Sequence, residues 1–165
     1  MLTLPETITR PAQAYAFIKY TVPMDKVLQP ADEGFPVLFA TLAEQGIAPV
    51  GPAFYNYRRI DMATTLDIEA GVAVAQAGTP TDRVQFGTLP AGRFVSLAWH
   101  GHPNKLEPVT GVLIGWVRQS GQVLDMEERS DGDHFACRLE IYVTDPDDEP
   151  DMDKWVTELA FKLKD

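Results

Sequence analysis

Apolar and polar residues alternate with two different periods along this chain, and the two periods follow one another in order. Residues 12–22, AQAYAFIKYTV, are rich in aromatic and β-branched residues, which favours a strand. Residues 30–46, PADEGFPVLFATLAEQG, place apolar side chains at helical spacing before a terminating glycine. Two strand-like segments follow, AFYNYRRI at 53–60 and TLDIEAGVAV at 65–74. The first half therefore predicts a strand, a helix and two strands.

The second half of the chain repeats this order. GTPTDRVQFGTLPAG at 78–92 lacks periodicity and predicts a connection. RFVSLAWHG at 93–101 is typical of a strand, and residues 103–120 carry one apolar helical stripe. We expect an acidic loop next, and then two strands, HFACRLEIYV at 134–143 and WVTELAFKL at 155–163.

The repeated order predicts one domain made of two similar units. A chain of 165 residues has a length typical of a single domain. We expect an α+β fold in which a strand-helix-strand-strand unit is duplicated, at about residues 12–75 and 90–163. The strands would form one mostly antiparallel sheet with both helices on one face.

Alternation assigns the side chains of the strand at 134–143 to two faces. One face is apolar throughout, with Phe135, Cys137, Leu139, Ile141 and Val143. We expect the helices to cover that face. The other face carries Arg138, Glu140 and Tyr142.

The strand at 53–60 is the counterpart of this strand in the first unit. Tyr55 and Tyr57 fall on one of its sides, and Phe54, Asn56 and Ile60 fall on the other. If the two units pair across a pseudo-twofold axis, the tyrosines lie beside Glu140. The arrangement would be a carboxylate in an aromatic groove.

Charge excludes some classes of partner. The chain has 14 Lys and Arg against 24 Asp and Glu, a net charge of -10, which repels nucleic-acid phosphates and anionic lipid surfaces. No apolar run has membrane-spanning length, and the first residues lack the pattern of a signal peptide. The single Cys137 agrees with a reducing compartment. We therefore expect a cytoplasmic protein that binds neither nucleic acid nor membrane directly.

Motifs for metal, nucleotide or nucleophilic chemistry are not visible. His100 and His102 flank Gly101, but a metal site needs three or four converging ligands, and His134 is distant in sequence. The chain contains no G-x-S-x-G, P-loop or G-x-G-x-x-G motif. We expect no metal and no cofactor.

Five stretches, in order, resemble the GyrI-like effector-binding domains, which also occur behind DNA-binding heads in BmrR-type and AraC-type regulators. They are GPAFYNY (51–57), LDIEAGVAV (66–74), LPAGRFVSLAWHGHPNKL (89–106), LEIYVTDP (139–146) and TELAFKL (157–163). The resemblance implies the duplicated unit and an aromatic pocket or groove between the two units. Few residues precede the first predicted strand, so we expect a standalone domain without a DNA-binding head.

The resemblance also implies which residues bind a ligand. Glu140 occupies the place of the family's central glutamate, and Tyr57 and Tyr142 match positions that line family pockets. Tyr55, Trp99, Arg138 and Glu69 complete the candidate set. For Trp99 and Trp116 packing in the core is the alternative, and for Glu69 it is a place on the surface.

Three functions remain open at this stage. The first is binding of lipophilic, mainly cationic, small molecules around Glu140. The second is hydrolysis of cyclopropane-bearing or other electrophilic xenobiotics, as reported for some standalone relatives, with Glu140 as acid or base. The third is inhibition of a macromolecular partner such as gyrase, through the acidic surface.

Overall fold

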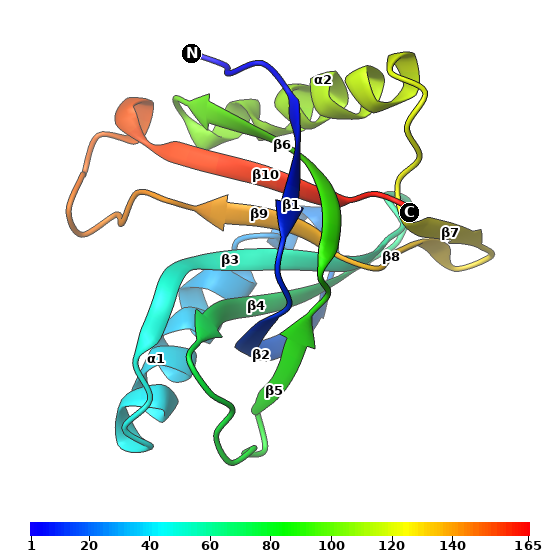
Figure 1. Ribbon diagram of the computed structural model, residues 1–165. Coiled ribbons are helices and arrows are strands. Elements are labelled where there is room, and N and C mark those ends of the chain that lie inside the picture. The colour runs from blue at the N-terminus through cyan, green and yellow to red at the C-terminus, as the bar shows by residue number, and fades with distance from the viewer.

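The computed structural model describes all 165 residues as one strongly curved sheet with two α-helices (Figure 1). The strands are β1 Glu6–Arg10, β2 Gln13–Val22, β3 Pro49–Ile60, β4 Leu66–Val74, β5 Val84–Leu89, β6 Gly92–His100, β7 Met126–Arg129, β8 Gly132–Phe135, β9 Arg138–Tyr142 and β10 Val156–Lys162. The helices are α1 Phe35–Glu44 and α2 Leu106–Gln119. Every strand pair is antiparallel, so the predicted α+β class is confirmed. No helix is long and apolar enough to cross a membrane.

The strand order is symmetric about a central seam. It runs β1-β6-β10-β9-β3-β4-β2-β5, and the β7–β8 hairpin is attached to β3. Outward from the β3–β9 seam, each half presents its second, third and first strand in turn. The matching orders support the proposal that residues 12–75 and 90–163 are repeated units.

Both helices follow from the apolar stripes of the sequence. Leu38 and Leu42 of α1 are buried against β2 and β4, and Leu113 and Val117 of α2 are buried against β6 and β10. Each helix ends near a glycine with positive φ, Gly46 after α1 and Gly121 after α2. The helices therefore cover the two halves of the sheet and leave the seam between them.

The curvature of the sheet creates a second apolar core on its inner face. β5 lies at one edge of the sheet and is followed after Pro90 and Ala91 by β6, near the other edge, so the two edges approach each other (Figure 1). Inside this curl a buried cluster spans the sheet, formed by Tyr15, Phe17, Phe54, Leu89, Phe94, Cys137, Leu139, Ile141 and Ala160. The outer face carries the helices.

The prediction that helices cover the apolar face of β9 was wrong. Leu139 and Ile141 pack inside the curl, where strands from both halves bury them without a helix. Glu140 points to the opposite, helix-bearing face. An apolar strand face requires a cover, and here a curved sheet supplies it instead of a helix.

Several boundaries also differ from the prediction. The expected connection at 78–92 contains β5, which pairs with β2, and the expected acidic loop contains β7. The expected strand at 134–143 is interrupted, so that β8 ends at Phe135 and β9 begins at Arg138. A register shift between Tyr57 and Arg59 moves Ile60 onto the face of the tyrosines.

Candidate functional site

Glu140 lies at the centre of the helix-bearing face. On β9 it is directly opposite Tyr55 of β3 and Leu159 of β10, and directly opposed residues share a face. Leu159 belongs to the cluster under α2, and Tyr55 belongs to a cluster that includes Phe35 of α1. The register therefore places one carboxylate at the seam, between the two helices.

Two tyrosines donate hydrogen bonds to this carboxylate. The hydroxyl of Tyr142 is 2.6 Å from Glu140 Oε1, and the hydroxyl of Tyr57 is 3.4 Å from the same oxygen. None of the ion pairs in the structure includes Glu140. Glu140 thus has neutral hydrogen-bond donors but no ion pair.

Burial controls protonation in this cluster. Loss of water raises the pKa of Glu140 above its ordinary value, and the two tyrosine hydrogen bonds and Arg138 oppose that rise. Burial and the nearby carboxylate raise the pKa values of Tyr57 and Tyr142 well above 10. The tyrosines therefore stay neutral donors at physiological pH.

Tyr55 contributes its ring to the groove and its hydroxyl to the scaffold. The hydroxyl donates to Val27 O and accepts from Ala31 N, both at 2.8 Å, which fixes the segment that leads into α1. Its ring makes edge contacts with Tyr57 and Tyr142, at centroid distances of 5.9 and 5.3 Å. Tyr55 is buried, so its hydroxyl is not available to a ligand.

Phe35 is a groove residue that the sequence did not reveal as one. It begins α1 and is partly buried, and its ring centroid lies 5.9 Å from that of Tyr55 and 6.2 Å from that of Tyr142. Helical spacing placed Phe35 on the apolar stripe of the predicted helix, but only the approach of α1 to the seam brings its ring to the tyrosines. We use the name seam groove, after the groove expected from the sequence, for the four rings and the carboxylate that meet at the seam: Phe35, Tyr55, Tyr57, Tyr142 and Glu140.

Arg138 shares the face of Glu140 but does not form an ion pair with it. Its guanidinium carbon lies 4.6 Å from the ring centroid of Phe161, 4.7 Å from that of Phe135 and 5.9 Å from that of Tyr57. Its buried Nε has no hydrogen-bond partner, and burial lowers the pKa of Arg138. The protein thus already holds one cation against aromatic rings next to the seam groove.

Trp99 and Trp116 lie in the half covered by α2. Both are partly buried against the cluster beneath that helix. Trp99 is opposite Thr157, which is opposite Tyr142, so one strand separates Trp99 from the tyrosine, about 10 Å. Its indole donates to His102 O at 3.0 Å. Trp99 therefore stabilises the turn before α2.

Glu69 lies on the other side of the sheet from Glu140. It is opposite Asn56, whose neighbour Tyr55 faces the seam groove, so Glu69 faces the inside of the curl. Its side chain is almost fully buried, and its Oε1 accepts from Tyr15 Oη at 2.7 Å and from Asn56 Nδ2 at 2.9 Å. The suggestion that Glu69 shares a groove with Glu140, and the alternative of a surface position, are both corrected by this register.

The fold is that of a family of small-molecule-binding domains. The family model for the GyrI-like small molecule binding domain matches residues 5–164, and the chain belongs to that family. No curated protein matches the sequence significantly.

Solved structures share the fold at low sequence identity. The C-terminal domain of EcmrR has a TM-score of 0.80 and 18% identity, with 98% of this chain and 97% of that chain covered. In the complex of EcmrR with DNA the TM-score is 0.82 at 18% identity, and 98% of this chain matches 57% of the EcmrR chain. This chain therefore spans little more than half of that regulator.

Two further structures carry information about ligands or activity. SAV2435 bound to tetraphenylphosphonium has a TM-score of 0.61 and 10% identity, with 98% of this chain and 94% of that chain covered. A hydrolase from Listeria innocua has a TM-score of 0.63 and 15% identity, with coverage of 97% and 91%. At these identities the similarity shows the fold alone.

Proposed function

We propose that this domain binds lipophilic cations in the seam groove, with Glu140 as the anionic group. The observation that carries the proposal is a partly buried carboxylate that receives two tyrosine hydrogen bonds and no ion pair. A carboxylate removed from water is destabilised unless a charged or hydrogen-bonding partner compensates it. A bound cation would supply the partner that is missing.

The surrounding rings suit a cation whose charge is spread over an apolar body. Tyr57, Tyr142 and Phe35 can each contribute about 0.5–2 kcal/mol of cation-π attraction without requiring one ligand shape. The net charge of -10 attracts cations over long range. The structural similarity to SAV2435 bound to tetraphenylphosphonium supports this class of ligand.

A thermal-shift screen tests the proposal. A ligand that binds only the folded state raises the unfolding midpoint. We expect tetraphenylphosphonium and other lipophilic cations to raise it, neutral aromatics of similar size to raise it less, and Glu140→Gln to remove the cation-selective part. If no cation in the panel shifts the midpoint, or if Glu140→Gln responds as the native protein does, the proposal is wrong.

A second candidate is hydrolysis of strained or electrophilic xenobiotics. The raised pKa of Glu140 and the similarity to a hydrolase from Listeria innocua favour it. Glu140 would take a proton from water while the water oxygen attacks a ring carbon. The carbon–carbon bond of a cyclopropane would break, and its electron pair would then receive that proton.

Mass spectrometry would detect a product heavier by one water, formed by the native protein and not by Glu140→Gln. Unchanged cyclopropane-bearing alkylators would exclude this activity for the compounds tested.

A further inference from the structure

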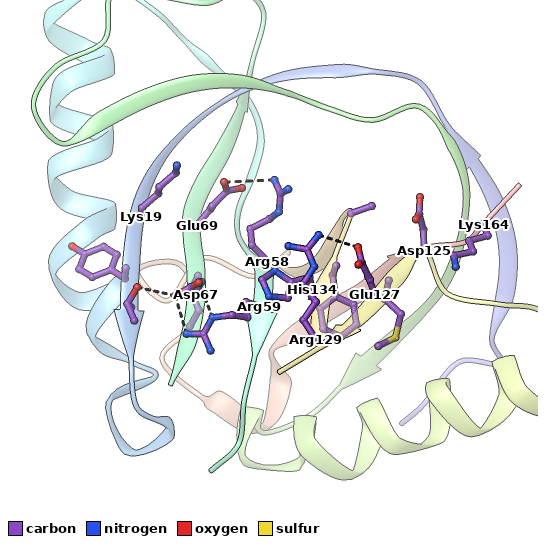
Figure 2. Close-up of a pocket in the computed structure, with 16 residues that line it drawn as sticks. Lys19, Arg58, Arg59, Asp67, Glu69, Asp125, Glu127, Arg129, His134 and Lys164 are labelled. Carbon is purple, nitrogen blue, oxygen red and sulfur yellow. Dashed lines mark hydrogen bonds and ion pairs between the residues drawn. The ribbon is translucent and has the colours of Figure 1, made fainter. Parts of the chain in front are cut away.

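A cavity lies on the opposite side of the sheet from Glu140. Its volume is about 840 Å³, within the range of about 300–1,000 Å³ that is typical of small-molecule sites. Strands β2, β3 and β4 form one side, and the β7–β8 hairpin with Lys164, next to the last residue, forms the other (Figure 2). We call this space the inner cavity. Most of its lining residues are polar or charged, so it suits a polar ligand.

The charge of the inner cavity differs from that of the whole chain. The lining holds five of the 14 basic residues, Lys19, Arg58, Arg59, Arg129 and Lys164. It holds only four of the 24 acidic residues, Asp67, Glu69, Asp125 and Glu127. A locally basic cleft in an acidic protein concentrates anions.

Every carboxylate in the lining already has a basic partner. Asp67 Oδ2 lies 2.9 Å from Arg59 Nε, and Glu127 Oε2 lies 2.9 Å from Arg129 Nη2. Asp125 Oδ2 lies 3.4 Å from Lys162 Nζ. These carboxylates are therefore neutralised within the protein.

The carboxylate of Glu69 also has partners within the protein, and it helps to position the guanidinium group of Arg58. Tyr15 and Asn56 donate to its Oε1, while its Oε2 lies 3.8 Å from Arg58 Nη1. This ion pair is long, and nearly half of the Arg58 side chain is exposed. Glu69 therefore orients Arg58 at the inner cavity and leaves guanidinium donors free.

The ammonium groups of two lysines in the lining lack any partner. Lys19 is directly opposite Glu69 on the neighbouring strand, yet no ion pair or hydrogen bond includes its ammonium group. The ammonium group of Lys164 is equally free, and only the backbone oxygen of that residue accepts a side-chain hydrogen bond, from Arg93. Figure 2 shows Lys19 and Arg58 near Glu69 at one side of the cavity and Lys164 at the other side, next to Asp125. Free positive charge thus stands at two separate places around one cavity.

We propose that the inner cavity binds a small organic anion that carries more than one carboxylate or phosphate group. Lys19 and Arg58 bind one anionic group, and Lys164 binds the other. Carboxylate and phosphate present the same charged oxygens to ammonium and guanidinium donors. This site is separate from the seam groove, and its existence does not depend on cation binding there.

Citrate, pyrophosphate and acetate, titrated into the full chain at constant ionic strength, test this site. Binding is followed through amide chemical shifts, which report on β2 and β4 separately from β9. We expect citrate or pyrophosphate to bind saturably and to shift the amide resonances of residues around Lys19 and Glu69. Acetate should bind at least about tenfold more weakly, because its single carboxylate contacts only one of the two groups of basic residues. The polyanion that binds more tightly shows whether the site prefers carboxylate or phosphate groups.

Lys19→Gln and Lys105→Gln form the decisive pair of variants. Both residues are exposed lysines, but only Lys19 lines the inner cavity. We expect Lys19→Gln to weaken polyanion binding by about tenfold, the loss of one charged hydrogen bond, and Lys105→Gln to leave it unchanged. Tetraphenylphosphonium binding should be equal in both variants. Absence of saturable polyanion binding, or equal weakening by the two variants, would overturn the proposal.

Discussion

The hydroxyl of Tyr142 donates a 2.6 Å hydrogen bond to the carboxylate of Glu140, two positions earlier on the same strand. Residues separated by two positions share a face of a strand, so this pair is set by local geometry. The second donor, Tyr57, comes from the other half of the sheet and lies 3.4 Å away. The carboxylate therefore has one local donor and one donor that depends on pairing at the seam.

Removing the two hydroxyls should have unequal effects on cation binding. The shorter hydrogen bond does more to hold the pKa of Glu140 down. We expect Tyr142→Phe to raise that pKa and weaken tetraphenylphosphonium binding by about tenfold near pH 6, since a hydrogen bond to a charged group contributes about 1.5–3 kcal/mol. Tyr57→Phe should weaken it less. Calorimetric titration of both variants between pH 5 and 8 measures this, and a larger effect for Tyr57→Phe would contradict the geometry.

Glu140 should destabilise the ligand-free protein at neutral pH. Its folded pKa lies above its unfolded value, so in the range between the two pKa values the folded state holds more protons than the unfolded state. The stability of the native protein should therefore increase as pH falls through the folded pKa. We expect Glu140→Gln to unfold at a higher temperature than the native protein at pH 7.5.

That stability difference should narrow toward pH 5, because Gln cannot ionise and the native carboxylate becomes protonated. Thermal unfolding by circular dichroism at several pH values measures it. Glu6→Gln, which removes an exposed carboxylate on the edge strand β1, controls for the change in net charge. A native protein that is more stable than Glu140→Gln at pH 7.5 would contradict the inferred cost of burial.

Phe35→Ala should affect both stability and binding. The ring of Phe35 contacts Tyr55 and Tyr142, so its loss removes apolar contacts and one wall of the seam groove. We expect a loss of about 1–2 kcal/mol in the free energy of unfolding, less than for a fully buried ring, and weaker cation binding. Phe39→Ala, on the same helix but 37% exposed, is the matched control. Urea titration and calorimetry should show a smaller effect for the control on both quantities.

Cys137 should be chemically inert in the folded protein. It is buried in the inner apolar cluster, and burial raises the pKa of its thiol to about 12. Alkylation requires the thiolate, so iodoacetamide at pH 7.5 should label the protein only after unfolding. Rapid labelling of the native state, followed by mass spectrometry, would show that the β9 region opens more readily than its packing implies.

The sequence predicted the centre of the seam groove because its geometry is local or repeated. Alternation placed Arg138, Glu140 and Tyr142 on one face of β9, and the repeated order of elements predicted that Tyr55 and Tyr57 would be close to Glu140. These predictions are confirmed as positions. Their roles in ligand binding stay predictions.

The remaining features depend on curvature, which periodicity does not encode. Leu139 required a cover, but alternation alone does not distinguish a helix from the inside of a curled sheet. The same ambiguity placed Glu69 in the wrong groove, because its face follows from its pairing with Asn56. Phe35 joins the seam groove only through the position of α1, and Lys164 reaches the inner cavity only through the return of the C-terminus to the β7–β8 hairpin.

Calorimetric titration of tetraphenylphosphonium at pH 7.5 into the native protein and Glu140→Gln tests the central claim most directly. Triphenylphosphine oxide, a neutral molecule with a related aromatic body, separates charge recognition from apolar burial. We predict one saturable site for the cation in the native protein, an affinity at least about tenfold lower in Glu140→Gln, and equal affinities of the two proteins for the neutral compound. Equal affinity of both proteins for the cation, or no binding to the native protein, would contradict the account of Glu140 as the anionic group of a cation site.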